Sequence, residues 1–187
     1  MQIEETALPG VRIITPARHR DGRGWFSETF SAAALAAHGI EITWVQDNHS
    51  FSARKDTLRG LHYQRPPVAQ DKLVRCSRGA ILDVAVDFRA GSPTFARWVA
   101  VELSAENGRQ LLIPKGFLHG FLTLAEGVEV QYKCSAPYAP ECDAAIRWDD
   151  SDIGIDWPLS GAPLLSDKDC AAPFLRDVAS PFEWSRT

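Results

Sequence analysis

The segment ILDVAVDF at residues 81–88 carries the alternation that decides the fold. Apolar side chains at positions 82, 84, 86 and 88 would share one face of an extended chain, and Asp83 and Asp87 would share the other. Period-two alternation of this kind predicts a β-strand. Further short strand-like segments lie at 58–64, 71–76, 98–103, 109–113, 117–124 and 128–134. Such spacing predicts a mainly β sandwich or small barrel with a few short helices.

Turn and cap signals organise these segments. Asn107-Gly108 is a strong hairpin signal, so we expect the segments on either side of it to pair with each other. A helix is predicted early in the chain over 32–37, where Ser31 can cap the start and Gly39 can end it. Proline recurs at positions 158, 163, 173 and 181. We expect a single domain over 1–187, with N-terminal strands and a helix in 1–50, the barrel core in 51–150 and a wrapping segment in 151–187.

Composition excludes several classes of protein. The chain has 187 residues, of which 45% are hydrophobic, enough for one domain with a proper core. Its net charge of −4 gives no overall field to attract nucleic acid or an anionic membrane, so any anion site must be a local cluster. The N-terminus lacks the layout of a signal peptide, and no stretch is apolar enough to span a membrane. The four cysteines show neither zinc spacing nor a disulfide framework, so we expect a cytoplasmic protein with free thiols.

The segment LRGLHYQ at residues 58–64 is the first candidate for chemistry. His62 suits proton transfer near neutral pH, and Arg59 suits a bound phosphate. In a regular strand these two side chains would face opposite sides, but a bulge at Gly60 would turn both toward one cavity. A base and an anion clamp on one strand predict an enzyme that acts on a phosphorylated small molecule.

A lone histidine in a strand is more often structural than catalytic. A carboxylate that orients His62 would favour the catalytic interpretation, because a base is normally held in one tautomer by a third group. Asp167 and Asp169 are both candidates, and their spacing does not choose between them.

Strand alternation aims two further titratable groups inward. Tyr132 shares a face with the apolar side chains of 128–134, and Lys72 shares a face with Val74 and Cys76. Taken alone, Lys72 would more often be an edge-strand residue whose ammonium reaches solvent. Together with His62, however, these groups would line one interior, which indicates a site.

The segment PKGFLH at residues 114–119 has a Pro-x-Gly-x-x-His spacing that resembles the second signature of the cupin β-barrels. Metal-binding cupins carry a His-x-His pair and a glutamate in the first signature, whereas this chain reads His62-Tyr63-Gln64 there. Two imidazoles without a third ligand make a poor zinc or iron site. We therefore expect a cupin-like jelly roll without a metal or other cofactor. A metal-dependent cupin oxygenase is the disfavoured alternative.

A more specific resemblance runs nearly end to end. The chain resembles the dTDP-4-dehydrorhamnose 3,5-epimerase family in a series of motifs that occur in the same order. They are DGRGWFSE (21–28), QDN (46–48), LRGLHYQ (58–64), QDKLVR (70–75), PKGFLHGF (114–121), YK (132–133), YAP (138–140), WDD (148–150) and LSDKD (165–169).

The resemblance implies a substrate and catalytic roles. The substrate would be dTDP-4-dehydro-6-deoxy-D-glucose, whose C3 and C5 hydrogens are acidified by the C4 ketone, and the product dTDP-4-dehydro-L-rhamnose. His62 would be the base and Asp169 its orienting carboxylate. Lys72 would stabilise the enolate oxygen. Tyr132 would return a proton from the opposite face.

The resemblance also implies binding residues. Nucleotide contacts would come from Arg23, Arg59 and Lys168, polar contacts to substrate from Glu28, Gln46 and Asn48, a contact near the sugar from His119, and thymine stacking from Tyr138. This chain has Asp143-Ala144 where the family often has glutamate before glycine, which puts that carboxylate contact in doubt. Without the resemblance, Arg23 would be assigned to a solvated loop and Tyr138 to loop packing.

The resemblance also implies a homodimer in which an N-terminal segment reaches the partner's sheet. The aromatic residues Trp25, Phe26, Phe30 and Trp44 fit such an interface or a core equally well. Relatives that epimerise only C3 or C5, or that isomerise the keto group, share these motifs and remain alternatives. A non-catalytic sugar-nucleotide binding module is disfavoured, because the predicted catalytic residues are all present.

Overall fold

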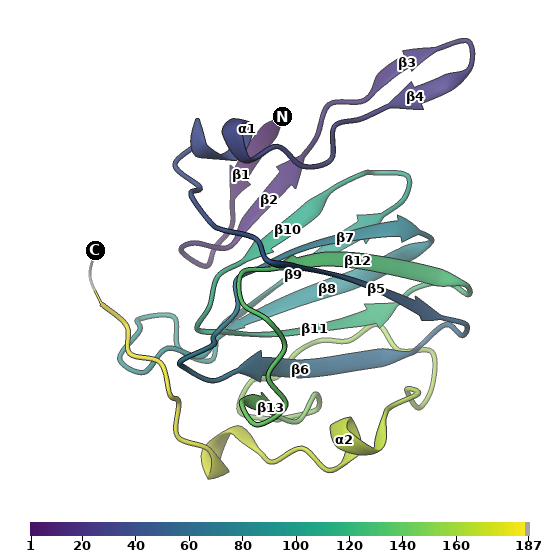
Figure 1. The fold of residues 1–187 in the computed structure, drawn as a ribbon. Helices are drawn as coiled ribbons and strands as arrows, with labels where there is room; N and C mark the ends of the chain where they lie inside the picture. Colours follow the sequence, from purple (N-terminus) through teal and green to yellow (C-terminus); the bar gives the residue numbers. More distant parts are fainter. Residues whose placement is uncertain (186–187) are drawn as a thin grey trace.

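The fold is a sandwich of two antiparallel sheets, seen in a computed structural model that describes residues 1–185 (Figure 1). The first sheet has the order β1-β2-β10-β7-β12-β5 and the second β13-β6-β11-β8-β9. The strands of the first sheet are β1 (Gln2–Glu5), β2 (Arg12–Thr15), β10 (Gln110–Ile113), β7 (Lys72–Arg78), β12 (Val128–Cys134) and β5 (Gln46–Ser52). Those of the second are β13 (Asp143–Ala145), β6 (Leu58–Gln64), β11 (Phe117–Thr123), β8 (Ala80–Asp87) and β9 (Trp98–Ser104). The predicted mainly β jelly-roll class is confirmed.

The predicted hairpin between β9 and β10 is wrong. The turn itself forms, since Asn107 Oδ1 accepts hydrogen bonds from the backbone N–H groups of Ser104 at 3.1 Å and Arg109 at 2.9 Å. The strands that it joins belong to different sheets, because β10 pairs with β2 and β7 while β9 pairs with β8. The Asn-Gly turn therefore carries the chain around the edge of the sandwich.

Strand β8 is covered on both faces. Ile81 and Ala85 belong to the cluster that fills the space between the sheets. Val84, Val86 and Phe88 point the other way, into a second cluster under the C-terminal segment. Burial of each such side chain contributes about 1.5–3 kcal/mol. Because neither face is solvated, the aspartates of the alternating pattern lie in the interior of the protein.

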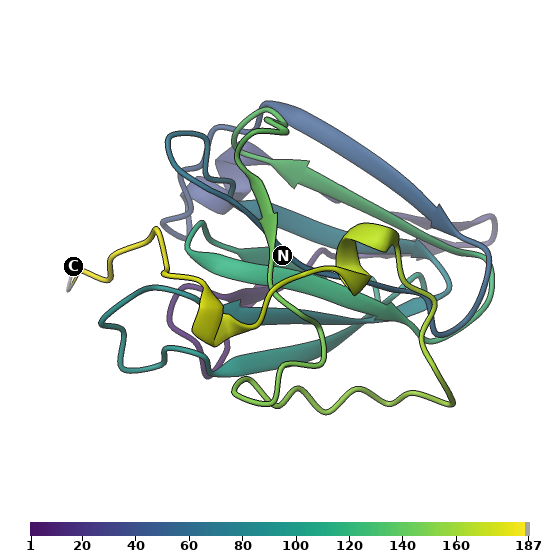
Figure 2. The ribbon, with the colours of Figure 1, turned by 90° about the horizontal axis from the view of Figure 1, so that it is seen from below.

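The C-terminal segment packs against the outer face of the second sheet. It contains α2 (Asp167–Cys170) and a 3₁₀ helix (Leu175–Asp177), and runs across that sheet (Figure 2). Phe182 anchors it, with its ring centroid 6.1 Å from that of Tyr63 and 6.4 Å from that of Phe88. The division into 1–50, 51–150 and 151–187 stays a prediction.

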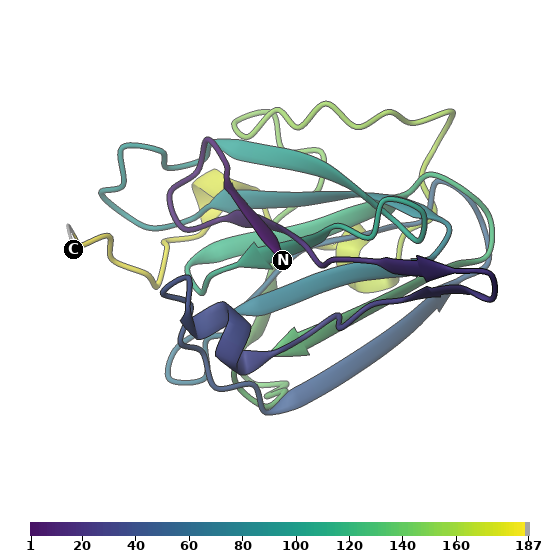
Figure 3. The same ribbon diagram turned by 90° about the horizontal axis from the view of Figure 1, so that it is seen from above.

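The N-terminal region covers the outer face of the first sheet (Figure 3). Helix α1 (Ala32–Ala36) begins as predicted, with Ser31 Oγ accepting from the N–H of Ala34 at 3.3 Å, and Leu35 packs into a cluster on this sheet. The helix ends one residue earlier than predicted, with Ala37 as its C-cap. No helix in residues 1–185 is long and apolar enough to cross a membrane.

A two-stranded hairpin, β3 (His19–Asp21) and β4 (Gly24–Phe26), projects away from the sandwich (Figure 1). Its aromatic side chains are exposed, Trp25 by 53% and Phe26 by 70%. In contrast, Phe30 packs edge-on against Trp44, with ring centroids 6.4 Å apart. The N-terminal aromatic residues are thus divided between a core cluster and an uncovered hairpin.

Candidate active site

The site is built around a histidine–aspartate pair on the second sheet. His62 on β6 lies with its Nε2 atom 2.5 Å from Oδ1 of Asp169 in α2. The hydroxyl of Ser166 donates to the other oxygen of Asp169 at 2.7 Å. Burial alone would raise the pKa of Asp169, but its hydrogen bonds with His62 and Ser166 hold that pKa below the usual value. Because Asp169 is then an acceptor, Nε2 carries the proton and Nδ1 is free to act as the base.

Strand β6 bulges at Gly60, as the sequence predicts. His62 pairs with His119 and Arg59 with Phe121, so β6 has one more residue than β11 between these pairs. Gly60 has φ +135°, and a Cβ there would lie 2.5 Å from the Cα of Gly120. Only glycine fits this contact, and the irregularity turns Arg59 and His62 toward the same side.

Two further titratable groups come from the first sheet. Lys72 lies on β7 between β10 and β12, so the edge-strand interpretation of this lysine is wrong. Burial lowers the pKa of Lys72, while the charges of Asp143 and Asp83 act against this shift. Tyr132 on β12 packs against the inter-sheet core, and burial raises the pKa of its phenol. Tyr132 therefore keeps its proton at neutral pH and can serve as an acid.

A second histidine–aspartate pair lies beside the first. His119 Nε2 donates to Oδ1 of Asp83 at 2.8 Å, and both side chains are buried. Burial lowers the pKa of His119, although Asp83 favours the charged form. The strand pattern identified Asp83 only by its face, and sequence reasoning missed its place beside the site. A carboxylate on the inner face of a buried strand was the available signal, because such a charge requires a partner.

A polar cluster lies where α2 meets β5 and β13, which are edge strands of the two sheets, and we call this edge of the sandwich the opening. Asp143 Oδ2 accepts from Lys168 Nζ at 2.5 Å and from the Tyr138 hydroxyl at 3.2 Å. Gln46 Oε1 accepts from the backbone N–H of Tyr138 at 2.9 Å, and Gln46 Nε2 donates to Asn48 at 3.0 Å. These five predicted binding residues are brought together, from both sheets and from α2.

Arg59 reaches from the second sheet toward the first. Its guanidinium donates to the carbonyl of Phe51 at 3.3 Å and lies 3.5 Å from the hydroxyl of Ser52, both on β5. Its positive charge also acts on Tyr132. Arg59 thus bridges the two sheets beside Tyr132, where an anion could bind it.

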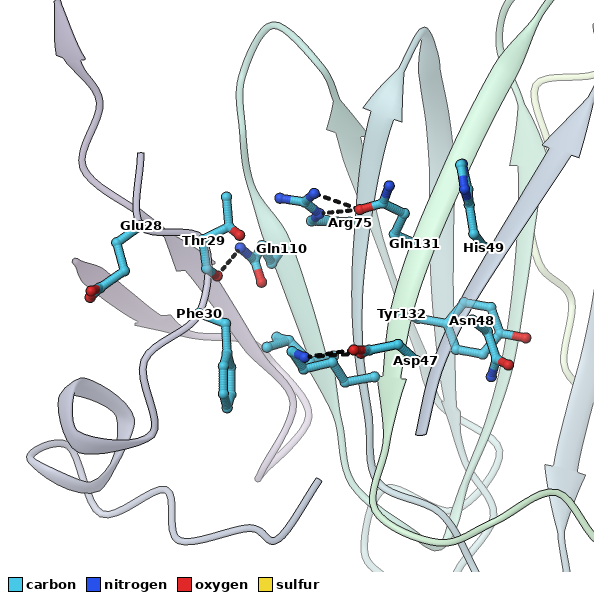
Figure 4. Close-up of a pocket in the computed structure, with 12 residues that line it drawn as sticks. Glu28, Thr29, Phe30, Asp47, Asn48, His49, Arg75, Gln110, Gln131 and Tyr132 are labelled. Atoms are coloured by element: carbon cyan, nitrogen blue, oxygen red, sulfur yellow. Dashed lines mark hydrogen bonds and ion pairs between the residues drawn. The ribbon is translucent and has the colours of Figure 1, made fainter. Parts of the chain in front are cut away.

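Arg23 and Glu28 are not brought to this cluster within the chain. Arg23 is on the projecting hairpin, where its side chain is 91% exposed and paired with Asp21 at 2.6 Å. Glu28 lies at a separate groove of about 510 Å³ on the outer face of the first sheet. In Figure 4, Arg75 and Gln131 line this groove, while Tyr132 extends to the other side of the sheet.

Gln64 stands where metal-binding cupins have a second histidine, and its side chain holds a neighbouring loop in place. Gln64 Oε1 accepts from the N–H of Ala139, and Gln64 Nε2 donates to the carbonyl of Pro137, both at 2.9 Å. These bonds hold the loop that carries Tyr138. Within residues 1–185, no three His, Cys, Asp or Glu side chains are grouped to hold a metal. The predicted absence of a metal stays a prediction.

Ser166 is the other site residue that sequence reasoning missed. It caps α2 by accepting from the N–H of Asp169 at 3.2 Å and also donates to the Asp169 carboxylate. The pattern Ser-x-x-Asp before a short helix was the available signal, because serine at this position is a common N-cap. One hydroxyl thereby fixes both the helix start and the orienting aspartate.

Comparisons with known proteins identify the family of this chain. A family model described as dTDP-4-dehydrorhamnose 3,5-epimerase matches residues 5–177. The enzyme of that name from Salmonella typhimurium is 52% identical over 176 residues, which cover 94% of this chain and 96% of the relative. A crystal structure of the Legionella pneumophila dTDP-6-deoxy-D-glucose-3,5-epimerase in complex with dTDP-4-keto-L-rhamnose superposes with a TM-score of 0.94 at 44% identity, covering 100% of this chain and 99% of that one.

The solved structures also include a related enzyme of narrower action. ChmJ, a 3'-monoepimerase from Streptomyces bikiniensis in complex with dTDP-quinovose, superposes with a TM-score of 0.85 at 39% identity, covering 91% of this chain and 86% of that one. The Legionella enzyme has both a higher sequence identity and a higher TM-score than this ChmJ structure. The chain belongs to the dTDP-4-dehydrorhamnose 3,5-epimerase family and is an isomerase.

Proposed function

We propose that the chain epimerises C3 and C5 of dTDP-4-dehydro-6-deoxy-D-glucose to give dTDP-4-dehydro-L-rhamnose. The observation that carries this proposal is the placement of base and acid on opposite sheets. His62 lies on β6 of the second sheet and Tyr132 on β12 of the first. A sugar ring held between the sheets would present one face to each residue, as inversion at carbon requires.

The first half of the reaction is proton abstraction. Nδ1 of His62 removes the proton from a carbon next to the C4 ketone, and Asp169 stabilises the imidazolium that forms. The electron pair moves onto the C4 oxygen as an enolate. Lys72 supplies the positive charge that stabilises this oxygen in a largely buried setting, where such an interaction is strongest.

The second half is protonation from the other face. Tyr132 donates its phenolic proton to the enolate carbon, which is a strong enough base to take it. His62 then releases its proton to solvent and Tyr132 regains one, so that loss and return of a proton at C3 and at C5 give the doubly inverted product. The nucleotide would be held at the opening by Arg59, Lys168 and Tyr138.

Proton NMR in deuterated water tests this function directly. With dTDP-4-dehydro-6-deoxy-D-glucose as substrate, we expect deuterium at both C3 and C5 and an inverted configuration at both carbons. Deuterium at one carbon only would identify a mono-epimerase. Prior dialysis against EDTA is expected to leave the rate unchanged, and loss of activity that added metal restores would contradict the metal-free mechanism.

We further propose that the active form is a homodimer in which each projecting hairpin completes the site of the partner. Arg23 lies apart from the cavity of its own chain, and its neighbours Trp25 and Phe26 leave an apolar surface uncovered. In a dimer, a second copy would cover these aromatic side chains, and the diphosphate bound in its site would pair with Arg23.

The free thiols of the described chain support the predicted cytoplasmic location.

Co-expression of two impaired variants tests the exchange of hairpins. Arg23→Ala should weaken turnover at low substrate by about tenfold or more, since it removes a charge-assisted contact to the diphosphate. Co-expressed with His62→Ala, it should recover about a quarter of the wild-type rate, because half of randomly paired dimers would contain one intact site. Recovery no greater than the average of the separate variants would contradict the exchange and leave Arg23 acting within its own chain.

A further inference from the structure

One carboxylate oxygen at the opening holds two of the proposed nucleotide-binding groups. Asp143 Oδ2 accepts from Lys168 Nζ at 2.5 Å and from the Tyr138 hydroxyl at 3.2 Å. Asp143 is placed by β13, which pairs with β6 alongside His62. A cation and an aromatic ring that are expected to bind a nucleotide are therefore both engaged by an anion of the protein itself.

The negative charge of Asp143 can affect both the neighbouring ionisable groups and a bound ligand. The Asp143 side chain is 21% exposed and that of Lys168 is 43% exposed, so their pairing is only partly screened by solvent. The charge of Asp143 also raises the pKa of Tyr138 and acts on Lys72 and Tyr132 deeper in the cavity. An incoming diphosphate would meet the same negative charge.

The backbone around Tyr138 is held without the Asp143 side chain. Gln46 binds the N–H of Tyr138, and Gln64 binds the N–H of Ala139, each at 2.9 Å. Release of the Tyr138 hydroxyl from Asp143 would therefore free the side chain while the loop stays in place. Lys168 likewise extends from α2, whose start is fixed by Ser166.

We propose that Asp143 competes with the nucleotide diphosphate for Lys168. A ligand must therefore carry enough negative charge to displace Asp143 before it can bind Lys168. This inference rests on the proposed function, because it takes Lys168 as a diphosphate contact. A diphosphate carries more negative charge than one carboxylate and displaces Asp143 from the ammonium, whereas a monophosphate competes less well. If Asp143 instead made a favourable contact to the ligand, removal of its charge would lower the affinity for the nucleotide.

Calorimetric titration with dTDP and with dTMP distinguishes these roles. Asp143→Asn keeps the size of the side chain and removes its charge, so it should bind dTMP about fivefold more tightly than wild type and dTDP about threefold more tightly. The gain should shrink in roughly 0.5 M salt, where the Debye length is about 4 Å. Asp143→Glu, which keeps the charge, should stay within about twofold of wild type.

Asp149→Asn is the matched control. Asp149 forms an exposed ion pair with Arg147 at 2.8 Å, so its loss changes the net charge equally without touching the opening. Unchanged or weaker dTDP binding by Asp143→Asn would overturn the proposal, as would an equal gain in the Asp149→Asn control. Wild-type protein that binds neither nucleotide would instead contradict the proposed function itself.

Discussion

His62→Ala is expected to abolish the exchange of substrate C–H hydrogens with solvent deuterium, with a fall of about 10³-fold or more in exchange rate. The His62 imidazole is the group that we assign as the base, because Asp169 at 2.5 Å fixes its tautomer. Without it, neither C3 nor C5 can lose a proton, so exchange and epimerisation should fall together. Proton NMR in deuterated water measures both quantities in one sample.

The matched control for this variant is His38→Ala. His38 is exposed just beyond α1, on the outer side of the first sheet. The His38→Ala variant should catalyse both the exchange and the epimerisation of substrate at the wild-type rate. Retention of exchange at one carbon in His62→Ala would show that a second base serves that carbon, with the His119–Asp83 pair as the nearest candidate.

Tyr132→Phe is expected to separate exchange from inversion. The phenol lies on the sheet opposite His62, and burial raises its pKa, so it holds its proton until the enolate forms. Without it, His62 can still remove a proton and return deuterium to the same face. Inversion should therefore fall by about 10²-fold or more while exchange falls by less than about tenfold.

Tyr63→Phe provides the control for loss of a phenolic hydroxyl. Tyr63 is buried against Phe88, with ring centroids 5.1 Å apart, on the far face of β6. This variant should retain both rates. Equal loss of exchange and inversion in Tyr132→Phe would contradict the assignment of acid and base to separate faces.

Much of the fold could be predicted because short-range alternation encodes it. The segments at 58–64 and 128–134 match β6 and β12 at both ends, and the alternation aimed Tyr132 inward. The bulge at Gly60 was also accessible, because an arginine and a histidine on one cavity wall require it. These features depend on neighbours within a few residues along the chain.

Other features depend on which distant segments meet. The Asn-Gly turn at 107–108 encodes a reversal of the chain, but β2 and β7 decide the sheet that β10 joins. Asp169 and Asp167 were equally plausible partners of His62 by spacing, and only the start of α2 at Ser166 selects Asp169. Likewise, no local pattern places Lys168, Tyr138 and Asp143 within one hydrogen-bonded group.

The path of the C-terminal segment has a consequence for when the enzyme becomes competent. The base on β6 and its aspartate are 107 residues apart, and α2 follows all of the strands of both sheets in the chain. During synthesis, all of these strands therefore leave the ribosome before the residue that orients the base. Likewise, a protease that cuts between β13 and α2 and releases the C-terminal piece would remove both the aspartate that orients the base and the cover of the second sheet. Catalytic activity therefore requires that the C-terminal segment is present together with the two sheets.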